Sequence, residues 1–128
     1  MKAFTDIEQS KKLASILPVE SADMMWDDWS LIDEGWKLSV GYYPEIEKDY
    51  GRKCYPAWSL AALLDQLEDV VVDENGYEYK LQIIKEGVQY YLVYEGMLDA
   101  ACYETSVFDD LIDACVEMIF TLKEKDLS

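Results

Sequence analysis

Carboxylates are the side chains of this sequence with the most capacity for chemistry or binding, and they gather near its carboxyl end. The segment VFDDLIDACVEMIF, residues 107–120, holds four acidic residues and no base. Ser106 precedes it as a candidate N-cap, so we expect a helix over this segment. On that helix Asp109, Asp113 and Glu117 stand four residues apart and share one face. Such a row is a candidate site for acid–base chemistry or for binding a basic surface.

Phe120 is an apolar residue expected on the acidic side of this helix, between Asp109 and Asp113 in projection. An aromatic ring flanked by carboxylates could dock a basic partner, or the chain's own amino-terminal segment could cover it. The other apolar residues form one broad arc, which is typical of an amphipathic helix packed on a core. The acidic face therefore has two interpretations, a partner-binding surface or a solvated helix back.

Catalytic and metal-binding patterns are weak in this chain. There is no histidine, and paired carboxylates are so frequent that a solvated surface would give the same pattern. Residues 73–78 fail as a calcium loop, because Gly76 stands at the fourth position rather than the sixth and Ile84 replaces the glutamate of the twelfth. The glycines form no phosphate-binding loop. We therefore predict no catalytic residue, no metal site, no cofactor, and a protein that is not an enzyme.

Aromatic residues offer a second candidate surface, since the chain has ten tyrosines and four tryptophans and both types are enriched at interfaces. Trp26 and Trp29 bracket an Asp-Asp pair and are candidate partner-binding residues, or they cover the core. Four tyrosines of the central segment are expected on one face of a sheet, either beneath helices or exposed toward a ligand or partner: Tyr77, Tyr79, Tyr90 and Tyr94.

The net charge of −16 restricts the possible partners. Nucleic acid and anionic membranes require lysine and arginine opposite their phosphates, so direct binding to either is not expected. Residues 65–128 hold four bases and sixteen acids, and the stretch 86–122 holds eight acids and no base. We therefore predict a non-enzymatic domain that binds a basic protein surface, in an accessory or inhibitor-like role. Two alternatives stay open: a nucleic-acid mimic acting on a DNA-binding enzyme, and a small-molecule binder or enzyme with a Tyr- and Trp-lined pocket.

Length and cysteine content bear on domain number and compartment. The 128 residues suit one domain, predicted to span 1–128. The cysteines, Cys54, Cys102 and Cys115, form no close pair and are expected to be reduced and mostly buried. The amino terminus lacks the apolar run of a signal peptide, and no stretch approaches the length of a membrane span. These features favour a cytoplasmic protein without a membrane partner.

Capping and periodicity define the expected elements. We expect a helix from an N-cap at Thr5 to Pro18, a second helix from Pro56 into the following apolar segment, and the acidic helix described above. Residues 19–35 are expected to be irregular or to hold a short helix, and 44–56 to be a polar connection. Strand patterns cover 36–42, 70–72, 77–83 and 88–94, with a hairpin signal at Asn75-Gly76.

These elements predict the α+β class. The last three strands should form an antiparallel meander, which the strand that starts at Trp36 would join. The result is an antiparallel sheet of three to four strands with helices packed on one face.

Three segments carry a resemblance: IEQSKKLASILPVESADM near the start, CYPAWSLAALLDQL in the middle and DACVEMIFTLKE at the end. Together they resemble an uncharacterised family of small acidic proteins associated with gut anaerobes and with their phages or mobile elements. The resemblance covers well under half of the chain. It implies a cytosolic setting and an accessory or mobile-element origin, and it supplies no functional residue.

Overall fold

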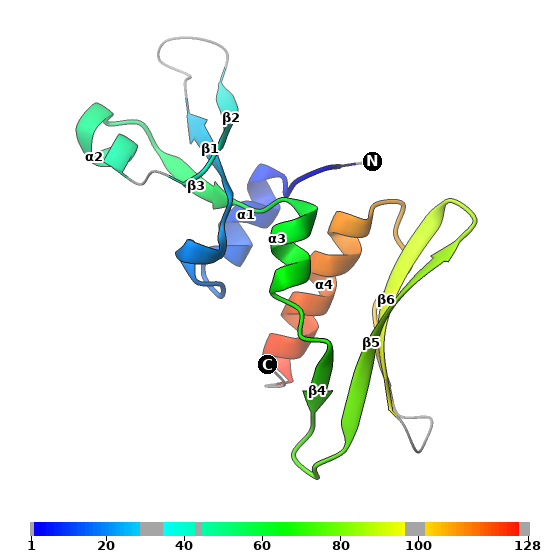
Figure 1. Ribbon diagram of the computed structural model, residues 1–128. Helices are drawn as coiled ribbons and strands as arrows, with labels where there is room; N and C mark the ends of the chain where they lie inside the picture. Colours follow the sequence, from blue (N-terminus) through cyan, green and yellow to red (C-terminus); the bar gives the residue numbers. More distant parts are fainter. Residues whose placement is uncertain (1, 29–34, 43–44, 97–101, 126–128) are drawn as a thin grey trace. The chain divides into compact units, whose positions relative to one another are not determined.

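The computed structural model of the protein describes residues 2–28, 35–42, 45–96 and 102–125 (Figure 1). The backbone divides into two compact units: an amino-terminal unit, Ala3–Ala62, and a carboxyl-terminal unit, Leu63–Ser128 together with Met1–Lys2. The chain combines helices with two antiparallel sheets, which confirms the predicted α+β class. A single domain over 1–128 stays a prediction. None of the described helices is long and apolar enough to cross a membrane.

The amino-terminal unit is built on a three-stranded antiparallel sheet in the order β2-β1-β3. Its strands are β1 (Met24–Asp28), β2 (Trp36–Val40) and β3 (Cys54–Ala57). The helical elements are α1 (Ile7–Leu13), the short 3-10 helix Val19–Ser21 and α2 (Glu45–Tyr50). α1 packs against β3. Leu13, Met25 and Trp58 are fully shielded from solvent.

Several predictions for this unit differ from the structure. Residues 19–35 do hold the short helix that was one of the two expectations, Val19–Ser21, but they also contain the unpredicted β1. The segment expected to be a polar connection runs into β3, and the strand at Trp36 pairs with β1 rather than with the later meander. Pro56, expected at a helix start, lies in β3. A proline can occupy β3 because this is an edge strand, where one side of the backbone needs no partner.

The N-cap of the first helix lies one residue later than predicted. Asp6 is the N-cap: its carboxylate accepts the Gln9 amide at 2.8 Å, and the Gln9 side chain accepts the Asp6 amide at 3.1 Å. Thr5 is instead buried, with its hydroxyl 2.8 Å from that of Ser10 and accepting the Trp58 amide at 3.1 Å. The capping signal was right in kind, but it belongs to the neighbouring residue.

The carboxyl-terminal unit is built on a four-stranded antiparallel sheet in the order β4-β5-β6-β7. Its strands are β4 (Val70–Val72), β5 (Glu78–Glu86), β6 (Gln89–Gly96) and β7 (Cys102–Glu104). The meander of the first three strands was predicted, including the turn at Gly76, whose φ of 84° favours glycine. β7 was not predicted.

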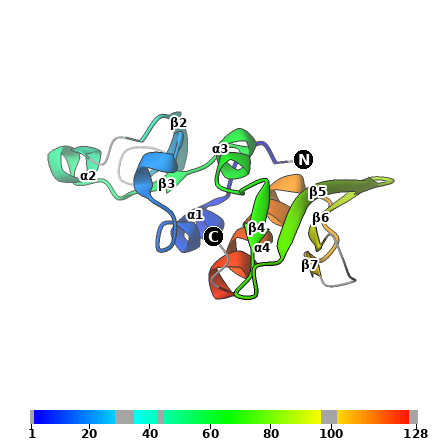
Figure 2. The same cartoon turned by 60° about the horizontal axis from the view of Figure 1, so that its bottom comes forward.

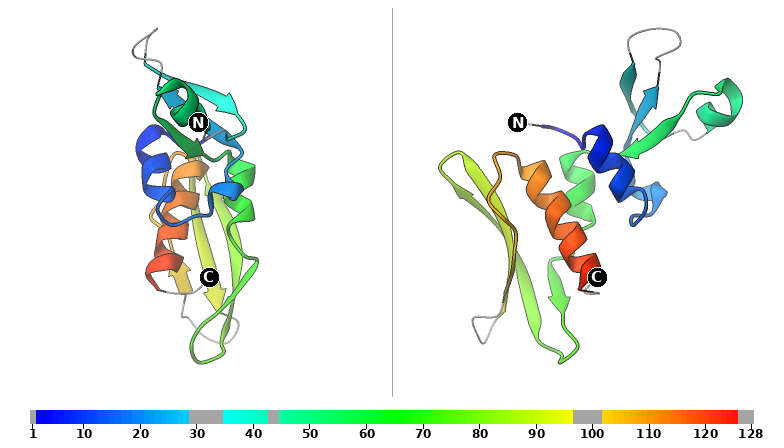
Figure 3. Two further views of the ribbon diagram at one scale, coloured as in Figure 1. Left: turned by 90° about the vertical axis from the view of Figure 1, so that its left-hand side faces the viewer. Right: turned by 180° about the vertical axis from the view of Figure 1, so that it is seen from behind.

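Helix α4 (Leu111–Glu124) covers one face of this sheet and packs on β6 (Figure 3). Its buried residues include Ile112, Cys115, Met118 and Leu122. This arrangement confirms the predicted sheet of three to four strands with a helix on one face. The unit boundary falls inside α3 (Leu60–Asp65), whose start is capped by the Ser59 hydroxyl accepting the Ala62 amide at 3.2 Å.

Candidate functional site

Fewer residues of the predicted acidic row, Asp109, Asp113 and Glu117, lie on the helix than their spacing predicts. α4 begins at Leu111 after an N-cap at Asp110, so Asp109 lies before the helix. Ser106 is not the cap. Its backbone amide donates instead to the Glu117 carboxylate at 2.9 Å. The segment before α4 pairs with β6 and is therefore held extended: Phe108 and Tyr90 exchange two backbone hydrogen bonds, of 2.7 and 2.8 Å.

Asp113 has a cation that its own half of the chain does not supply. The Lys2 ammonium lies 2.8 Å from an Asp113 carboxylate oxygen, with the two side chains 36% and 24% exposed. The Lys2 backbone amide also donates to the Asp110 carboxylate. No local sequence signal could have predicted this pair, because the partners are 111 residues apart. Part of the acidic row therefore has a structural role in holding the amino terminus.

The other residues of the predicted row keep differing degrees of exposure. Asp109 is exposed and accepts a long hydrogen bond of 3.4 Å from the Gln89 side chain. Glu117 and Phe120 are half-buried. Asp109, Asp113, Glu117 and Phe120 thus lie on or just before one helix, and their role in binding a partner stays a prediction.

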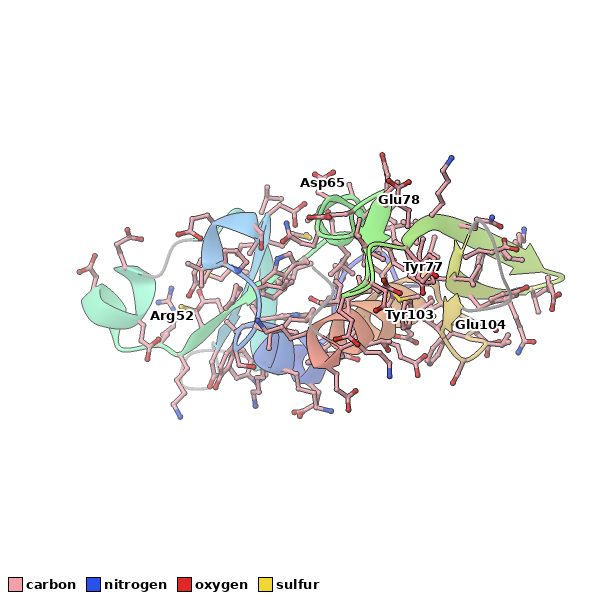
Figure 4. All side chains as sticks on the ribbon, turned by 90° about the horizontal axis from the view of Figure 1, so that it is seen from below. Arg52, Asp65, Tyr77, Glu78, Tyr103 and Glu104 are labelled. Atoms are coloured by element: carbon pink, nitrogen blue, oxygen red, sulfur yellow. The ribbon has the colours of Figure 1, made fainter. Side chains whose placement is uncertain are left out.

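Two of the four tyrosines predicted on one face of the sheet are part of the core, and a third, Tyr90, is half-buried. Tyr79 and Tyr94 are buried, and the Tyr94 hydroxyl donates to the Glu68 carbonyl at 2.6 Å. Tyr103 on β7 was missed by the sequence interpretation, and its ring meets that of Tyr79 edge-on at 5.0 Å between centroids. Tyr77, by contrast, precedes β5 and is 56% exposed (Figure 4). The buried rings of Tyr79 and Tyr94 are part of the core, so they offer no open aromatic surface.

A hydrogen-bonded turn anchors one end of this tyrosine cluster. The Asp73 carboxylate accepts the amides of Asn75 and Tyr77 at 2.9 and 3.0 Å and the Tyr79 hydroxyl at 2.8 Å. Burial opposes ionisation of Asp73, but these hydrogen bonds, first that from Tyr79, outweigh it and lower the pKa of the carboxyl group. The same bond to Asp73, and then burial, raises the pKa of Tyr79 well above its usual value.

Trp26 has one polar and one aromatic contact within the amino-terminal unit. It is half-buried, its indole N–H donates to the Thr5 carbonyl at 3.0 Å, and its ring meets Phe4 edge-on at 5.8 Å. Trp29 lies outside the described residues. The predicted tryptophan surface and the predicted acidic surface therefore belong to different units.

A buried ion pair of the amino-terminal unit was not predicted. Asp27 on β1 is 2% exposed. Its two carboxylate oxygens accept hydrogen bonds from Nε and Nη2 of Arg52, each at 3.1 Å. Figure 4 labels Arg52 in the connection between α2 and β3. The two-point geometry fits a guanidinium to a carboxylate. The pair could not be predicted from the sequence, because Asp27 stands in an acidic run that is typical of a surface. The burial of Asp27 depends on the pairing of β1 with β3.

The described cysteines are poor nucleophiles. Cys54 and Cys115 are buried and free, as predicted, whereas the side chain of Cys102 lies outside the described part of the chain. Burial raises the pKa of Cys115 to about 12. Burial, together with the nearby charges of Glu47 and Asp27, also raises the pKa of Cys54. Both thiols therefore stay protonated at neutral pH, and protonated thiols do not attack substrates.

One further feature is an unpaired length of strand. β4 pairs with β5 only over three residues, Val70–Val72, whereas β5 runs to Glu86 (Figure 2). β6 pairs with β5 along the whole of its other side up to Glu86. Residues 82–86 of β5 therefore have no strand neighbour on the β4 side among the described residues.

No group of histidine, cysteine, aspartate or glutamate side chains within the described ranges is arranged to hold a metal ion. Comparisons with protein-family models, with curated proteins and with solved structures find no match to this chain.

Proposed function

We propose that the protein is a non-enzymatic interaction protein whose carboxyl-terminal unit binds a basic surface on another protein. The observation that carries this proposal is the base-free stretch 86–122, which runs through β6, β7 and α4. A surface with this sign accelerates encounter with a cationic partner and disfavours anionic ones.

The exposed carboxylates of this stretch come from several elements. Glu86, Glu95, Glu104 and Asp109 are all exposed, and they lie in or beside β5, β6, β7 and the start of α4. Lys2 is the cation brought to α4, and it pairs with Asp113. Since these four exposed acids are half of the eight in the stretch, a substantial part of its negative charge is available to a partner. An accessory or inhibitor-like role in the cytoplasm fits this mode of binding.

The first experiment is capture of proteins from a cell lysate at about 50 mM and about 500 mM salt. We expect basic proteins to be captured at the lower salt concentration and lost at the higher one, because exposed charges are screened over a shorter distance as salt increases. Captured proteins of neutral or acidic composition, or capture that ignores salt, would contradict the proposal.

Two substitutions and a matched control test which residues form the binding surface. Asp109→Lys and Phe120→Ala are each expected to weaken capture about fivefold. Glu20→Lys makes the same change in net charge at an exposed position of the amino-terminal unit and should leave capture unchanged. Equal weakening by Asp109→Lys and Glu20→Lys would show that only the total charge matters and would remove the assigned surface.

A further inference from the structure

The sheet of the carboxyl-terminal unit has an edge where backbone groups lack a strand partner among the described residues. The last backbone bond on the β4 side of β5 is donated by the Leu81 amide to the Asp69 carbonyl, at 2.9 Å. From Gln82 to Glu86, β5 is paired with β6 alone. An open length of this kind is a template for an additional strand.

The register identifies the backbone groups that face the open side. Alternate residues of a strand direct their N–H and C=O groups to the same neighbour. Because the Leu81 amide points toward β4, the amides and carbonyls of Ile83 and Lys85 point to the same side, beyond the end of β4. The residues between them direct these groups to β6. The open side thus offers donors and acceptors spaced for antiparallel pairing.

The side chains along this length leave it approachable. Ile83 is 47% exposed, which gives the edge an apolar contact. A lysine on a natural edge strand often prevents another strand from pairing with it, and Lys85 is the lysine on this edge. Its ammonium, however, lies 5.9 Å from the ring centroid of Tyr90 on the same hairpin. Lys85 therefore contacts its own hairpin and can stay there when another strand approaches.

Acidic side chains stand at both ends of the open length. Glu68 and Asp69, where the chain enters β4, are exposed, and Glu86 is exposed at the hairpin end. A strand that continues the line of β4 would have its two ends near these carboxylates. Cationic residues at the ends of that strand would pair with them.

We propose that this edge, residues 82–86 of β5, binds an extended segment of the basic partner by strand addition. The segment pairs its backbone with Ile83 and Lys85, places apolar residues at alternate positions, and carries lysine or arginine near Glu68, Asp69 and Glu86. Backbone bonds supply affinity in this mode, and alternate side chains supply specificity. The proposal rests on the proposed function, because it assigns the part of the basic partner that is bound.

A second copy of the chain fits the edge less well than a cationic segment does. Antiparallel pairing of 82–86 with itself would place Gln82 opposite Glu86, so that an uncharged residue lies opposite the carboxylate at each hairpin end. It would also bring together two chains that each carry a net charge of −16, which repel one another.

The test uses a capped heptapeptide in which lysine and valine alternate, titrated into the full-length protein at about 50 mM salt. Amide hydrogen exchange, followed by NMR, is the first readout. In the free protein the amides of Ile83 and Lys85 should exchange rapidly, and those of Gln82 and Ile84 slowly because they are bonded to β6. The peptide should protect the first pair and leave the second unchanged.

Two peptide controls separate strand addition from attraction by charge alone. In one the valine amides are N-methylated and in the other the lysine amides, so that each lacks donors along one edge and keeps every charge. Strand addition predicts that at least one of these peptides binds about tenfold or more weakly than the unmethylated one. Equal binding of all three would overturn the proposal and leave the charge-driven function standing.

A matched pair of variants tests the protein side. Ile83→Pro removes an N–H that faces the open side, a position where an edge strand tolerates proline. It should weaken peptide binding about tenfold, whereas Ile83→Ala, which keeps the amide, should weaken it about threefold or less. Circular dichroism checks that both variants are folded, and the N-methylated peptides decide the matter if Ile83→Pro does not fold.

Three further outcomes would overturn strand addition. They are unchanged binding to Ile83→Pro, failure of the unmethylated heptapeptide to bind while basic proteins are still captured from lysate, and a dimer of the free protein in which the Ile83 amide is already protected. Loss of all capture from lysate would instead remove the proposed function on which the inference rests.

Discussion

At the scale of single residues, several carboxylates of this acidic sequence are held by cations or hydrogen-bond donors of the protein itself. Asp27 is held by Arg52, Asp73 by three donors of its own turn and β5, and Asp113 by Lys2. A count of acidic residues therefore overestimates the charge that a partner can contact. The carboxylates with the strongest contacts stabilise the fold, and those left exposed are the better candidates for binding.

The Asp27–Arg52 pair gives the first prediction. Arg52→Ala should lower the free energy of unfolding by about 3 kcal/mol, because it leaves a buried carboxylate without its guanidinium. Urea denaturation measures the change. Lys53→Ala, which removes the neighbouring exposed base, should change it by less than about 0.5 kcal/mol. Equal midpoints for the two variants would contradict a stabilising role for the pair.

The buried tyrosines predict a loss of stability in alkali. The hydrogen bond to Asp73 raises the pKa of Tyr79, and burial raises that of Tyr94. Each folded pKa exceeds the unfolded value of about 10. Their contribution is therefore fully present below about pH 10 and is lost as the pH rises from there through the folded pKa values.

Absorbance at the phenolate band, followed against pH, checks this prediction. Fewer than the ten tyrosines of the chain should ionise near pH 10 in the folded protein, and all ten should do so in urea. Tyr79→Phe should remove one of the late-ionising groups. Ionisation of all ten tyrosines near pH 10 without unfolding would contradict it.

At the scale of elements, local signals predicted some strands and helices and failed where long-range pairing decides the structure. The meander was predictable because β5 and β6 alternate and Gly76 suits the tight turn. β1 and β3 were not predictable, because an aspartate and a proline, Asp27 and Pro56, occupy buried strand positions. Only the pairing of the two strands accounts for these residues there. The start of α4 was misplaced because Phe108 pairs with Tyr90 and is drawn out of a helix that its periodicity favours.

The candidate site was predictable only in part for the same reason. The row of Asp109, Asp113 and Glu117 could be read from spacing along one segment. The approach of Lys2 to Asp113 could not, because it depends on contacts between opposite ends of the chain. The open side of β5 could not be predicted either, since it exists only because β4 is shorter than the strand beside it.

The cap of α1 gives a prediction at this scale. Asp6→Ala should lower the free energy of unfolding by about 1 kcal/mol, because it leaves the Gln9 amide without its carboxylate. Thermal or urea denaturation measures it. Glu8→Ala, in the exposed first turn of the same helix, should cost less than about 0.5 kcal/mol. A larger loss in Glu8→Ala than in Asp6→Ala would contradict the assigned cap.

At the scale of the whole molecule, the two units differ in net charge and in their content of tryptophan. The acidic excess is concentrated in residues 65–128, with four bases against sixteen acids. All four tryptophans belong to the amino-terminal unit, whereas α4, the longest described helix, belongs to the carboxyl-terminal unit. Tryptophan fluorescence therefore reports on the first unit alone, whereas helical circular dichroism reports on both units, because α1 and α2 lie in the first and α4 in the second.

These two probes test whether the chain is one cooperative domain. We predict a single transition in urea, with the same midpoint by both methods, as is usual for a chain of this size. The physical reason is that the boundary falls inside α3, whose Leu60–Ala62 belong to one unit and Leu63–Asp65 to the other. Unfolding one unit alone would break the hydrogen bonds of a helix that the other unit retains.

Arg52→Ala sharpens this test because it weakens the amino-terminal unit directly. In one cooperative domain, both the fluorescence and the dichroism midpoints should fall by the same amount. If the fluorescence midpoint falls while the dichroism signal splits into two transitions, the two units unfold independently, and each would then be a domain in its own right. In that case the peptide-binding experiments could be repeated while the amino-terminal unit is unfolded, and strand addition at β5 would be expected to persist.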